Sequence, residues 1–286
     1  MDKRSIIILS ILVIGIIAGT IIYTMGKFNV AKANNSSFQI NYSVIGTVKI
    51  YNTSALIPFL SSYINTTYVK LVNSVVKYGI INFIKINNTK GIIGYFKGGP
   101  LSSLAFYQIN STLTSHGFKY AEYQTLLYDY NTTTAIGFDG NYFYVVHQNS
   151  TNQNLTITLL YYLYTSNKTF TVTSLTNIIV TGSFRHSNFT AYSENSNIIV
   201  KGYFKGNFNN FTKFLRYFNF TTTNFTIAGK VIFKNSTVEI FSLSSMYENY
   251  TVYAMIGLKE ISSNTIYAVG IVSQSQISES EVLNLL

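Results

Sequence analysis

Hydrophobic and polar residues alternate along much of the chain, and this pattern predicts strands. The alternation is clearest over residues 38–44, 142–146 and 265–272, which are rich in Tyr, Phe, Ile and Val. Successive side chains of a strand point to opposite faces, so a period of two gives one apolar and one polar face. The body of the protein is therefore predicted to be α+β and rich in strands.

A second spacing, in which apolar residues recur every three or four positions, predicts helices between these strands. It is longest over residues 54–78, where Gly79 is expected to end the helix. Shorter helices are predicted over residues 101–115, 154–164, 207–218 and 278–286.

The order of these elements repeats. The sequence Gly-Tyr-Phe-Lys-Gly occurs at residues 94–98 and again at 202–206, and residues 135–137 resemble residues 255–257. The separation grows from 108 to 120 residues between the two matches, and an enlarged hairpin near residues 244–249 would account for the growth. We expect two similar halves, residues 38–166 and 167–286, each an antiparallel sheet with helices on one face. Their boundary is expected near the polar residues 166–169.

The repeated motif supplies a candidate surface. Alternation places Tyr and Lys on one face of each strand and Phe on the other. If Phe96 and Phe204 face the core, the Tyr and Lys side chains face solvent or a partner. The alternative is that they are ordinary strand residues between turn or bulge glycines. The candidate surface residues are Tyr95, Lys97, Tyr203 and Lys205.

The longest apolar run covers residues 5–25 and carries no charge. At 1.5 Å per residue, a helix of this length spans the ~30 Å hydrocarbon core of a bilayer. We expect residues 1–4 to be cytoplasmic, residues 5–25 to be a transmembrane helix and residues 26–37 to be a linker. Gly15 and Gly19 form a G-x-x-x-G face, which offers a possible dimer contact.

Two alternatives to an uncleaved anchor follow from the flanking residues. Ala31, Lys32 and Ala33 form an A-x-A pattern that a signal peptidase uses, although the apolar run is longer than that of a cleaved signal. Lys3, Arg4 and Ser5 ahead of the run resemble the processing site of archaeal type IV pilin precursors. That resemblance implies a pilin-like or thread-like filament subunit whose first four residues are removed.

Seventeen of the thirty asparagines stand in Asn-x-Ser/Thr, the acceptor pattern for N-glycosylation. Chance placement of the 61 Ser and Thr residues gives about six, and the reversed pattern, which no glycosylating enzyme reads, occurs five times. The excess is directional, so turn propensity does not explain it. The predicted acceptors are Asn34, Asn35, Asn41, Asn52, Asn65, Asn87, Asn110, Asn131, Asn149, Asn154, Asn167, Asn188, Asn210, Asn219, Asn224, Asn235 and Asn249.

All of these acceptors follow the apolar run, which predicts an extracellular C-terminal body. By itself, the number of positive charges on either side of the run is nearly balanced and does not decide the orientation.

Only 10% of residues are charged, a composition that suits acidic surroundings such as an archaeal cell surface, where carboxylates would be protonated. The chain has no cysteine, so stability must come from packing and hydrogen bonds.

The formal charge of +10 comes from scattered single lysines, which argues against nucleic acid as a partner. The bilayer, an envelope protein or a glycan fits the charge better as a partner.

His116, His147 and His186 lack the spacing of a metal site, so no metal or cofactor is expected. Asp129 and Asp139 are explained by neighbouring turns.

No catalytic motif of a known class is present, and we expect no enzymatic activity. The leading hypothesis is a surface glycoprotein that binds or scaffolds a component of the envelope. A secreted hydrolase is a further alternative, for which two of Glu122, Asp129, Asp139, Glu194 and Glu239 would have to converge.

Overall fold

The structure is a computed structural model of the 286-residue chain. It describes residues 41–52, 74–86, 89–168, 170, 172, 177–184, 187–216, 219–221, 226–247, 250–273 and 275–286. The predicted transmembrane helix, the linker and the pair Gly15 and Gly19 lie outside these residues. Within them, no helix is long and apolar enough to cross a bilayer.

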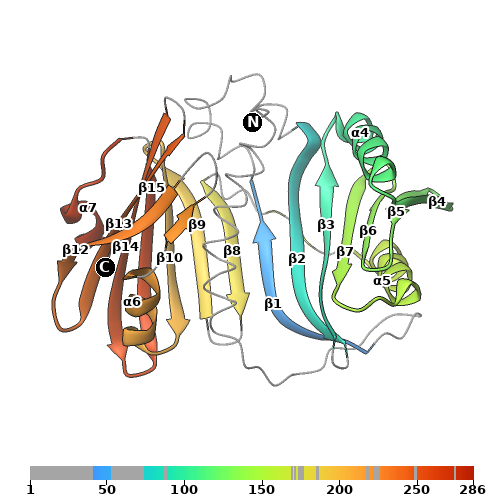
Figure 1. The fold of residues 1–286 in the computed structure, drawn as a ribbon. Coiled ribbons are helices and arrows are strands. Elements are labelled where there is room, and N and C mark those ends of the chain that lie inside the picture. The colour runs from blue at the N-terminus through green and yellow to red at the C-terminus, as the bar shows by residue number, and fades with distance from the viewer. Residues whose placement is uncertain are drawn as a thin grey trace.

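The described residues form one large antiparallel sheet with a few helices, so the predicted strand-rich α+β class is confirmed (Figure 1). The strands of the first half are β1 (Ser43–Ile50), β2 (Val76–Ile86), β3 (Thr89–Gly98), β4 (Lys119–Tyr123), β5 (Leu126–Tyr130), β6 (Thr134–Phe138) and β7 (Tyr142–Gln148). Those of the second half are β8 (Ile178–Phe184), β9 (Ser187–Glu194), β10 (Asn197–Lys205), β11 (Asn219–Thr221), β12 (Thr226–Lys234), β13 (Val238–Tyr247), β14 (Tyr250–Ser262) and β15 (Thr265–Ser273). The helices are α4 (Ser102–Ser115), α5 (Gln153–Thr165), α6 (Phe208–Arg216) and α7 (Glu279–Leu283).

The strand order runs β11-β12-β13-β14-β15-β10-β9-β8-β1-β2-β3-β7-β6-β5-β4 across the described part of the chain. Read outward from the centre, β1-β2-β3-β7-β6-β5-β4 follows the same order as β8-β9-β10-β15-β14-β13-β12, and β11 adds one short strand. A sheet of its own was expected for each half. Instead, the two halves share a single sheet that is joined between β1 and β8.

The joint between the halves is a short antiparallel contact. Its register pairs Thr47 with Ser183 and Val48 with Gly182. Two glycines make room for aromatic rings there. A Cβ on Gly46 would lie 1.8 Å from the ring of Phe184, and one on Gly182 would lie 2.0 Å from the ring of Phe189. The Phe184 ring thus crosses the joint from β8 to bare backbone of β1, whereas the Phe189 ring comes from β9 and covers β8 within the second half.

The helices lie on both faces of the sheet, so the prediction that they share one face is wrong. Tyr144 on β7 packs against α5, while its neighbour Phe143 packs against Phe106 of α4. Adjacent strand residues point to opposite faces, so α4 and α5 must cover opposite sides. The second half repeats this arrangement, because Phe241 packs with α6 and Ile240 packs with α7.

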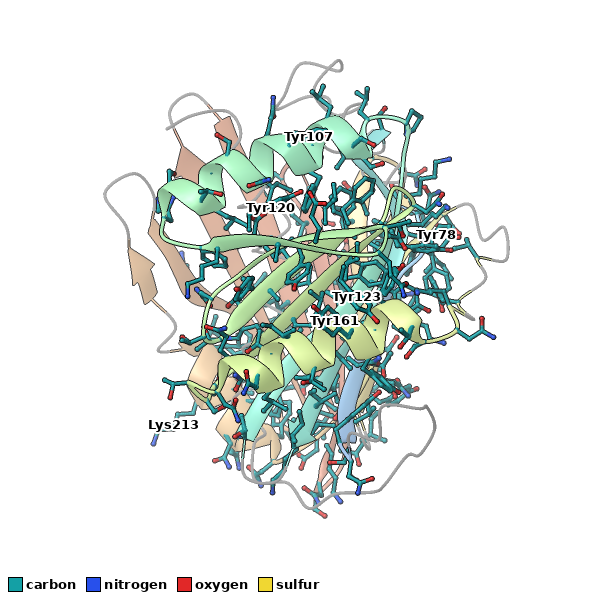
Figure 2. All side chains as sticks on the ribbon, turned by 90° about the vertical axis from the view of Figure 1, so that its right-hand side faces the viewer. Tyr78, Tyr107, Tyr120, Tyr123, Tyr161 and Lys213 are labelled. Carbon is teal, nitrogen blue, oxygen red and sulfur yellow. The ribbon has the colours of Figure 1, made fainter. Side chains whose placement is uncertain are left out.

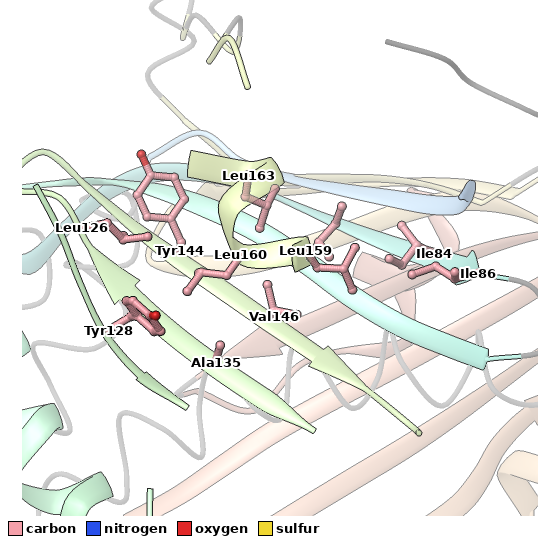
Figure 3. Packing of buried hydrophobic residues seen from close by; sticks show 11 residues of the cluster. Ile84, Ile86, Leu126, Tyr128, Ala135, Tyr144, Val146, Leu159, Leu160 and Leu163 are labelled. Carbon is pink, nitrogen blue, oxygen red and sulfur yellow. The ribbon is translucent and has the colours of Figure 1, made fainter. Parts of the chain in front are cut away.

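The largest buried cluster lies under α5 (Figure 3). Leu159, Leu160 and Leu163 of α5 meet Tyr144 and Val146 of β7, and all five side chains are at most 5% exposed. At roughly 1.5–3 kcal/mol for each fully buried side chain, contacts of this kind hold the helix to the sheet. Gly137 leaves room for these leucine side chains, because a Cβ there would lie 2.8 Å from Leu126 and 3.4 Å from Leu160.

The predicted helices 101–115 and 154–164 agree with α4 and α5 to within one residue at each end. Those at 207–218 and 278–286 begin within one residue of α6 and α7, but α7 ends three residues before the predicted end. The predicted end of the helix over 54–78 is wrong. Residues 53–73 lie outside the described residues, and β2 begins at Val76 and runs through Gly79. Pairing with β1 and β3 on both sides outweighs the local helical spacing there. The first strand begins at Ser43, so the described part of the 38–44 prediction overlaps it only at its end.

The extra residues of the second half lie in the predicted hairpin. β13 and β14 have 10 and 13 residues, whereas their counterparts β5 and β6 have 5 each. The predicted match of residues 135–137 with residues 255–257 is displaced by two residues. In the strand pairing, Ala135 corresponds to Gly257 and not to Met255. Ala135 pairs with Val146 and Gly257 pairs with Val269, and these two valines occupy equivalent places.

The first glycine of the repeated motif has the same role in both halves. A Cβ on Gly94 would lie 2.7 Å from the carbonyl oxygen of Ile80, and a Cβ on Gly202 would lie 2.3 Å from that of Asn188. The last glycine also repeats its contact. The Gly98 and Gly206 amides donate to the carbonyls of Asn141 and Asn264, at 2.8 and 3.0 Å. Close approach of neighbouring backbone therefore explains why glycine brackets the motif.

We predict that Gly202→Ala destabilises the protein by about 1–3 kcal/mol, because its Cβ would meet the fixed backbone of β9. Gly270→Ala is the matched control on the adjacent strand, where the nearest atom would be Val200 Cβ at 3.9 Å. The control should be neutral or slightly stabilising. Urea unfolding of both variants measures this, and equal effects would contradict the steric explanation.

Candidate functional site

The Tyr and Lys residues of the first motif copy are engaged with other side chains. Lys97 Nζ lies 4.6 Å from the centre of the Tyr142 ring and donates a hydrogen bond to Asn141 Oδ1 at 3.3 Å. Tyr95 contacts Tyr142 edge to face, with ring centres 6.0 Å apart, and packs against the cluster under α5. Burial raises the pKa of both tyrosines. This copy forms a partly buried cluster and not an open surface.

The second copy is more open. Tyr203 is 48% exposed and its ring centre lies 4.9 Å from that of Tyr267, and Lys205 is exposed. Phe204, between them in the sequence, is buried against α6 as the alternation required. Of the four predicted surface residues, Tyr95 and Lys97 are therefore partly buried against other side chains, and Tyr203 and Lys205 are exposed.

The predicted glycosylation acceptors lie at the surface wherever the structure describes their side chains. Seven of these ten asparagines are exposed, three are partly exposed and none is buried. The ten are Asn41, Asn52, Asn110, Asn131, Asn149, Asn154, Asn167, Asn188, Asn210 and Asn235. Of the remaining seven, Asn34, Asn35, Asn65, Asn87, Asn224 and Asn249 lie outside the described residues and Asn219 lies in β11.

Tyrosines gather around α5 and the adjacent strands. Tyr123 stacks on Tyr161 with ring centres 4.5 Å apart, and Figure 2 shows both residues on this side of the molecule. Tyr128 and Tyr161 share a hydrogen bond of 2.7 Å between their hydroxyl groups. Burial and this contact raise the pKa of Tyr128, so its hydroxyl stays protonated.

One lysine covers part of this tyrosine network. Lys168 Nζ lies 5.0 Å from the Tyr144 ring centre and donates to the carbonyl of Tyr164. Tyr144 in turn donates to Asp139 Oδ2 at 2.5 Å. Asp139 Oδ1 accepts the amides of Asn141 and Tyr142, as expected for a carboxylate in a hairpin turn. Lys168 thus ties the segment after α5 to the first half of the sheet.

Asp129 is not a turn residue, which corrects the sequence interpretation. It lies within β5, is 0% exposed and faces α4, because Leu127 on the same face packs against that helix's cluster. Neither of its carboxyl oxygens has a hydrogen-bond partner among the described residues. Burial raises its pKa, which favours the neutral acid.

A second buried carboxyl occupies the equivalent place in the other half. Asp129 lies opposite Ile136 of β6, and Glu239 of β13 lies opposite Leu258 of β14. Ile136 and Leu258 are equivalent because each lies two strands from the first glycine of the motif. Gly94 pairs with Val145, which pairs with Ile136, and Gly202 pairs with Ala268, which pairs with Leu258. Glu239 is 1% exposed and faces α6 as Asp129 faces α4. Sequence alone did not relate these two residues, since they are different amino acids in unrelated local sequences.

The remaining candidates for chemistry are dispersed. Glu122 accepts a hydrogen bond of 2.6 Å from Tyr120 on the same strand, and Glu194 is exposed at the end of β9. His116 and His147 are exposed, and His186 lies outside the described residues. Among the residues that the structure describes, no three His, Cys, Asp or Glu side chains gather where they could hold a metal ion.

The chain matches no protein-family model and no curated protein sequence. Two solved structures of TP0453, in crystal forms IV and III, are each 9% identical to it, with TM-scores of 0.33 and 0.35. They cover 88% and 89% of this chain and 97% and 99% of their own. The apo structure of the immunity protein TplEi from Pseudomonas aeruginosa is 10% identical over 72% of this chain and 90% of its own, with a TM-score of 0.23. Scores this low establish neither a shared fold nor a shared function.

We predict that acid stabilises the protein through Asp129. Between the ordinary Asp pKa near ~4 and the raised pKa in the folded chain, the folded state binds more protons than the unfolded state. The free energy of unfolding should therefore be highest below that window and fall as pH rises through it, by at most about 1.4 kcal/mol per pH unit. Asp129→Asn should flatten this decline in urea titrations at successive pH values.

Leu127→Ala is the control for that experiment, because Leu127 lies on the same face of β5 and does not titrate. It should lower stability by about 1–3 kcal/mol at every pH. Parallel pH profiles for the parent and Asp129→Asn would show that Asp129 carries none of the dependence.

Proposed function

We propose that the protein is a single-pass, membrane-anchored and heavily N-glycosylated surface protein of an archaeal-type envelope. Residues 5–25 hold it in the membrane, and the sheet lies outside the cell. Its work there is to bind or scaffold another envelope component, without catalysis. The observation that carries the proposal is the directional excess of Asn-x-Ser/Thr over its reverse.

Exposure of the acceptors supports the proposal. A transferase needs access to the asparagine amide, and a bulky glycan cannot be accommodated in a packed core. None of the ten acceptors whose side chains are described is buried, although they come from strands, helices and turns of both halves. A composition bias without selection for glycosylation gives no reason for the direction of the pattern.

Glycans also account for the unusual surface. With 10% charged residues, the chain relies on other groups to stay hydrated, and several large side chains face solvent. Leu104 and Tyr107 of α4 are 59% and 65% exposed, and Tyr120 on the edge strand β4 is 42% exposed (Figure 2). Attached sugars would shield such side chains from contact with other proteins.

The scaffolding part of the proposal rests on the duplicated order of elements. Two similar halves give two related surfaces on a single sheet, and the two motif copies differ in exposure. A gene duplication followed by divergence of one copy explains both features. The open copy, with Tyr203 and Lys205, is the better candidate for contact with a partner.

We predict that intact-mass measurement of the protein from its native membrane gives a mass well above the 32.1 kDa of the polypeptide, and that glycan removal restores the lower value. Peptide mapping should retain Met1 and locate glycans on the exposed acceptors. Loss of residues 1–4 would favour the pilin-like alternative. An unmodified chain would refute the proposal.

Anchoring is tested separately by deleting residues 1–25. The shortened chain, exported with a cleavable signal, should appear in the soluble fraction, whereas the parent stays with the membrane after a high-salt wash. Gly15→Leu with Gly19→Leu is the control, because it preserves the apolar length and removes only the close-approach face. Release of that control variant would contradict a simple hydrophobic anchor.

A further inference from the structure

A row of paired side chains crosses the centre of the sheet on one face. Asn188 of β9 lies between Ser183 of β8 and Tyr203 of β10, and Tyr203 lies opposite Tyr267 of β15. Directly opposed residues of an antiparallel pair point to the same side, with their Cβ atoms about 4.5–5.5 Å apart. An exposed glycosylation acceptor therefore stands beside a pair of tyrosines whose ring planes are tilted by 43° to each other.

The face of this row is fixed by the residues next to it. Phe189 follows Asn188 and Phe204 follows Tyr203, and both phenylalanines are 6% exposed in the cluster that includes α6. The strand period then directs Asn188 and Tyr203 to the opposite face. Thr190, the third residue of the acceptor pattern, shares the face of Asn188, so the pattern is presented as a unit.

We propose that the first sugar of the glycan on Asn188 packs against the Tyr203 and Tyr267 rings. Tyr203 is 48% exposed, so a large part of its side chain is open to solvent. Sugar rings have an apolar face of C–H groups, and an exposed aromatic ring offers a matching flat surface. On the other side of Asn188 stands the small Ser183, which gives no competing wall. The proposal rests on the function proposed above and names the part of the surface that a glycan completes.

The first half provides an internal comparison. There Tyr95 corresponds to Tyr203, and its neighbour across the strand pair is Ile80, which accepts no glycan. Tyr95 is covered by the chain itself, because it contacts Tyr142 and lies in the cluster under α5. Protein covers the aromatic side chain where no acceptor is present. In the second half, where the acceptor is present, the ring is left open for the sugar.

The test is a double-mutant cycle on the full chain purified from glycosylating cells. Asn188→Gln removes the glycan and should lower the thermal midpoint by about 1–3 °C in the parent, since it uncovers the rings. In a Tyr203→Ala background the same removal should cause no shift. Tyr203→Phe retains the ring and should restore the sensitivity to glycan removal.

Two controls separate stacking from general effects. Asn149→Gln removes another exposed acceptor, and its effect should be the same with or without Tyr203. Tyr120→Ala removes a tyrosine that is 42% exposed and pairs with Asp129 and not with an acceptor, so it should leave the effect of Asn188→Gln unchanged. Circular dichroism checks that each variant is folded.

Peptide mapping of the same samples distinguishes the two proposals. The stacking is supported if Asn188 carries a glycan and the effect of Asn188→Gln depends on the presence of the Tyr203 ring. Additive effects of Asn188→Gln and Tyr203→Ala overturn the stacking and leave the glycoprotein function standing. So does an empty Asn188 in a chain that is glycosylated elsewhere. A chain with no glycan at any acceptor overturns both.

Discussion

The single sheet depends on the pairing of β1 with β8, where the ring of Phe184 lies over Gly46. On the next strand pair, β8 with β9, the ring of Phe189 lies over Gly182 in the same way. Any larger side chain at either glycine would occupy the space of a ring. The joint also sets the register between the two halves. Val48 pairs with Gly182 there, and the remaining strands of each half follow outward from β1 or from β8. One short contact thus aligns two sets of strands that otherwise pair among themselves.

Equivalent positions in the two halves keep the same backbone role but differ in side-chain surroundings. Gly94 and Gly202 meet equivalent carbonyls of the neighbouring strands, and Asp129 and Glu239 are both buried on the faces that α4 and α6 cover. In contrast, the motif tyrosine is covered in the first half and open in the second. Backbone constraints that involve close approach leave few substitutions available, whereas an exposed face can change its partner without loss of the fold.

Periodicity predicted the strand-rich class and the places of α4 to α7, because apolar residues of each helix, such as Phe106 of α4 and Leu159 of α5, pack against the sheet. It failed at residues 76–79, where pairing with two neighbouring strands outweighs helical spacing. It also failed to place helices on both faces, since Phe143 and Tyr144 are both apolar and the sequence does not say which helix each one meets. The Asn-x-Ser/Thr pattern identified the acceptors, but their exposure and the pairing of Asn188 with Tyr203 required the structure.

The long sequence distance across the joint has a kinetic consequence. Most strands pair with a neighbour only a few residues away, as β9 does with β10, and such hairpins form in microseconds. The partners Thr47 and Ser183 are instead more than a hundred residues apart, so closing the joint carries a large loop-entropy cost. During synthesis, the outer edge of β1 must wait for β8 to be made. During that interval it is an open strand edge. Under the function proposed above, glycans at Asn41 and Asn52 on either side of β1 would hinder its pairing with another chain.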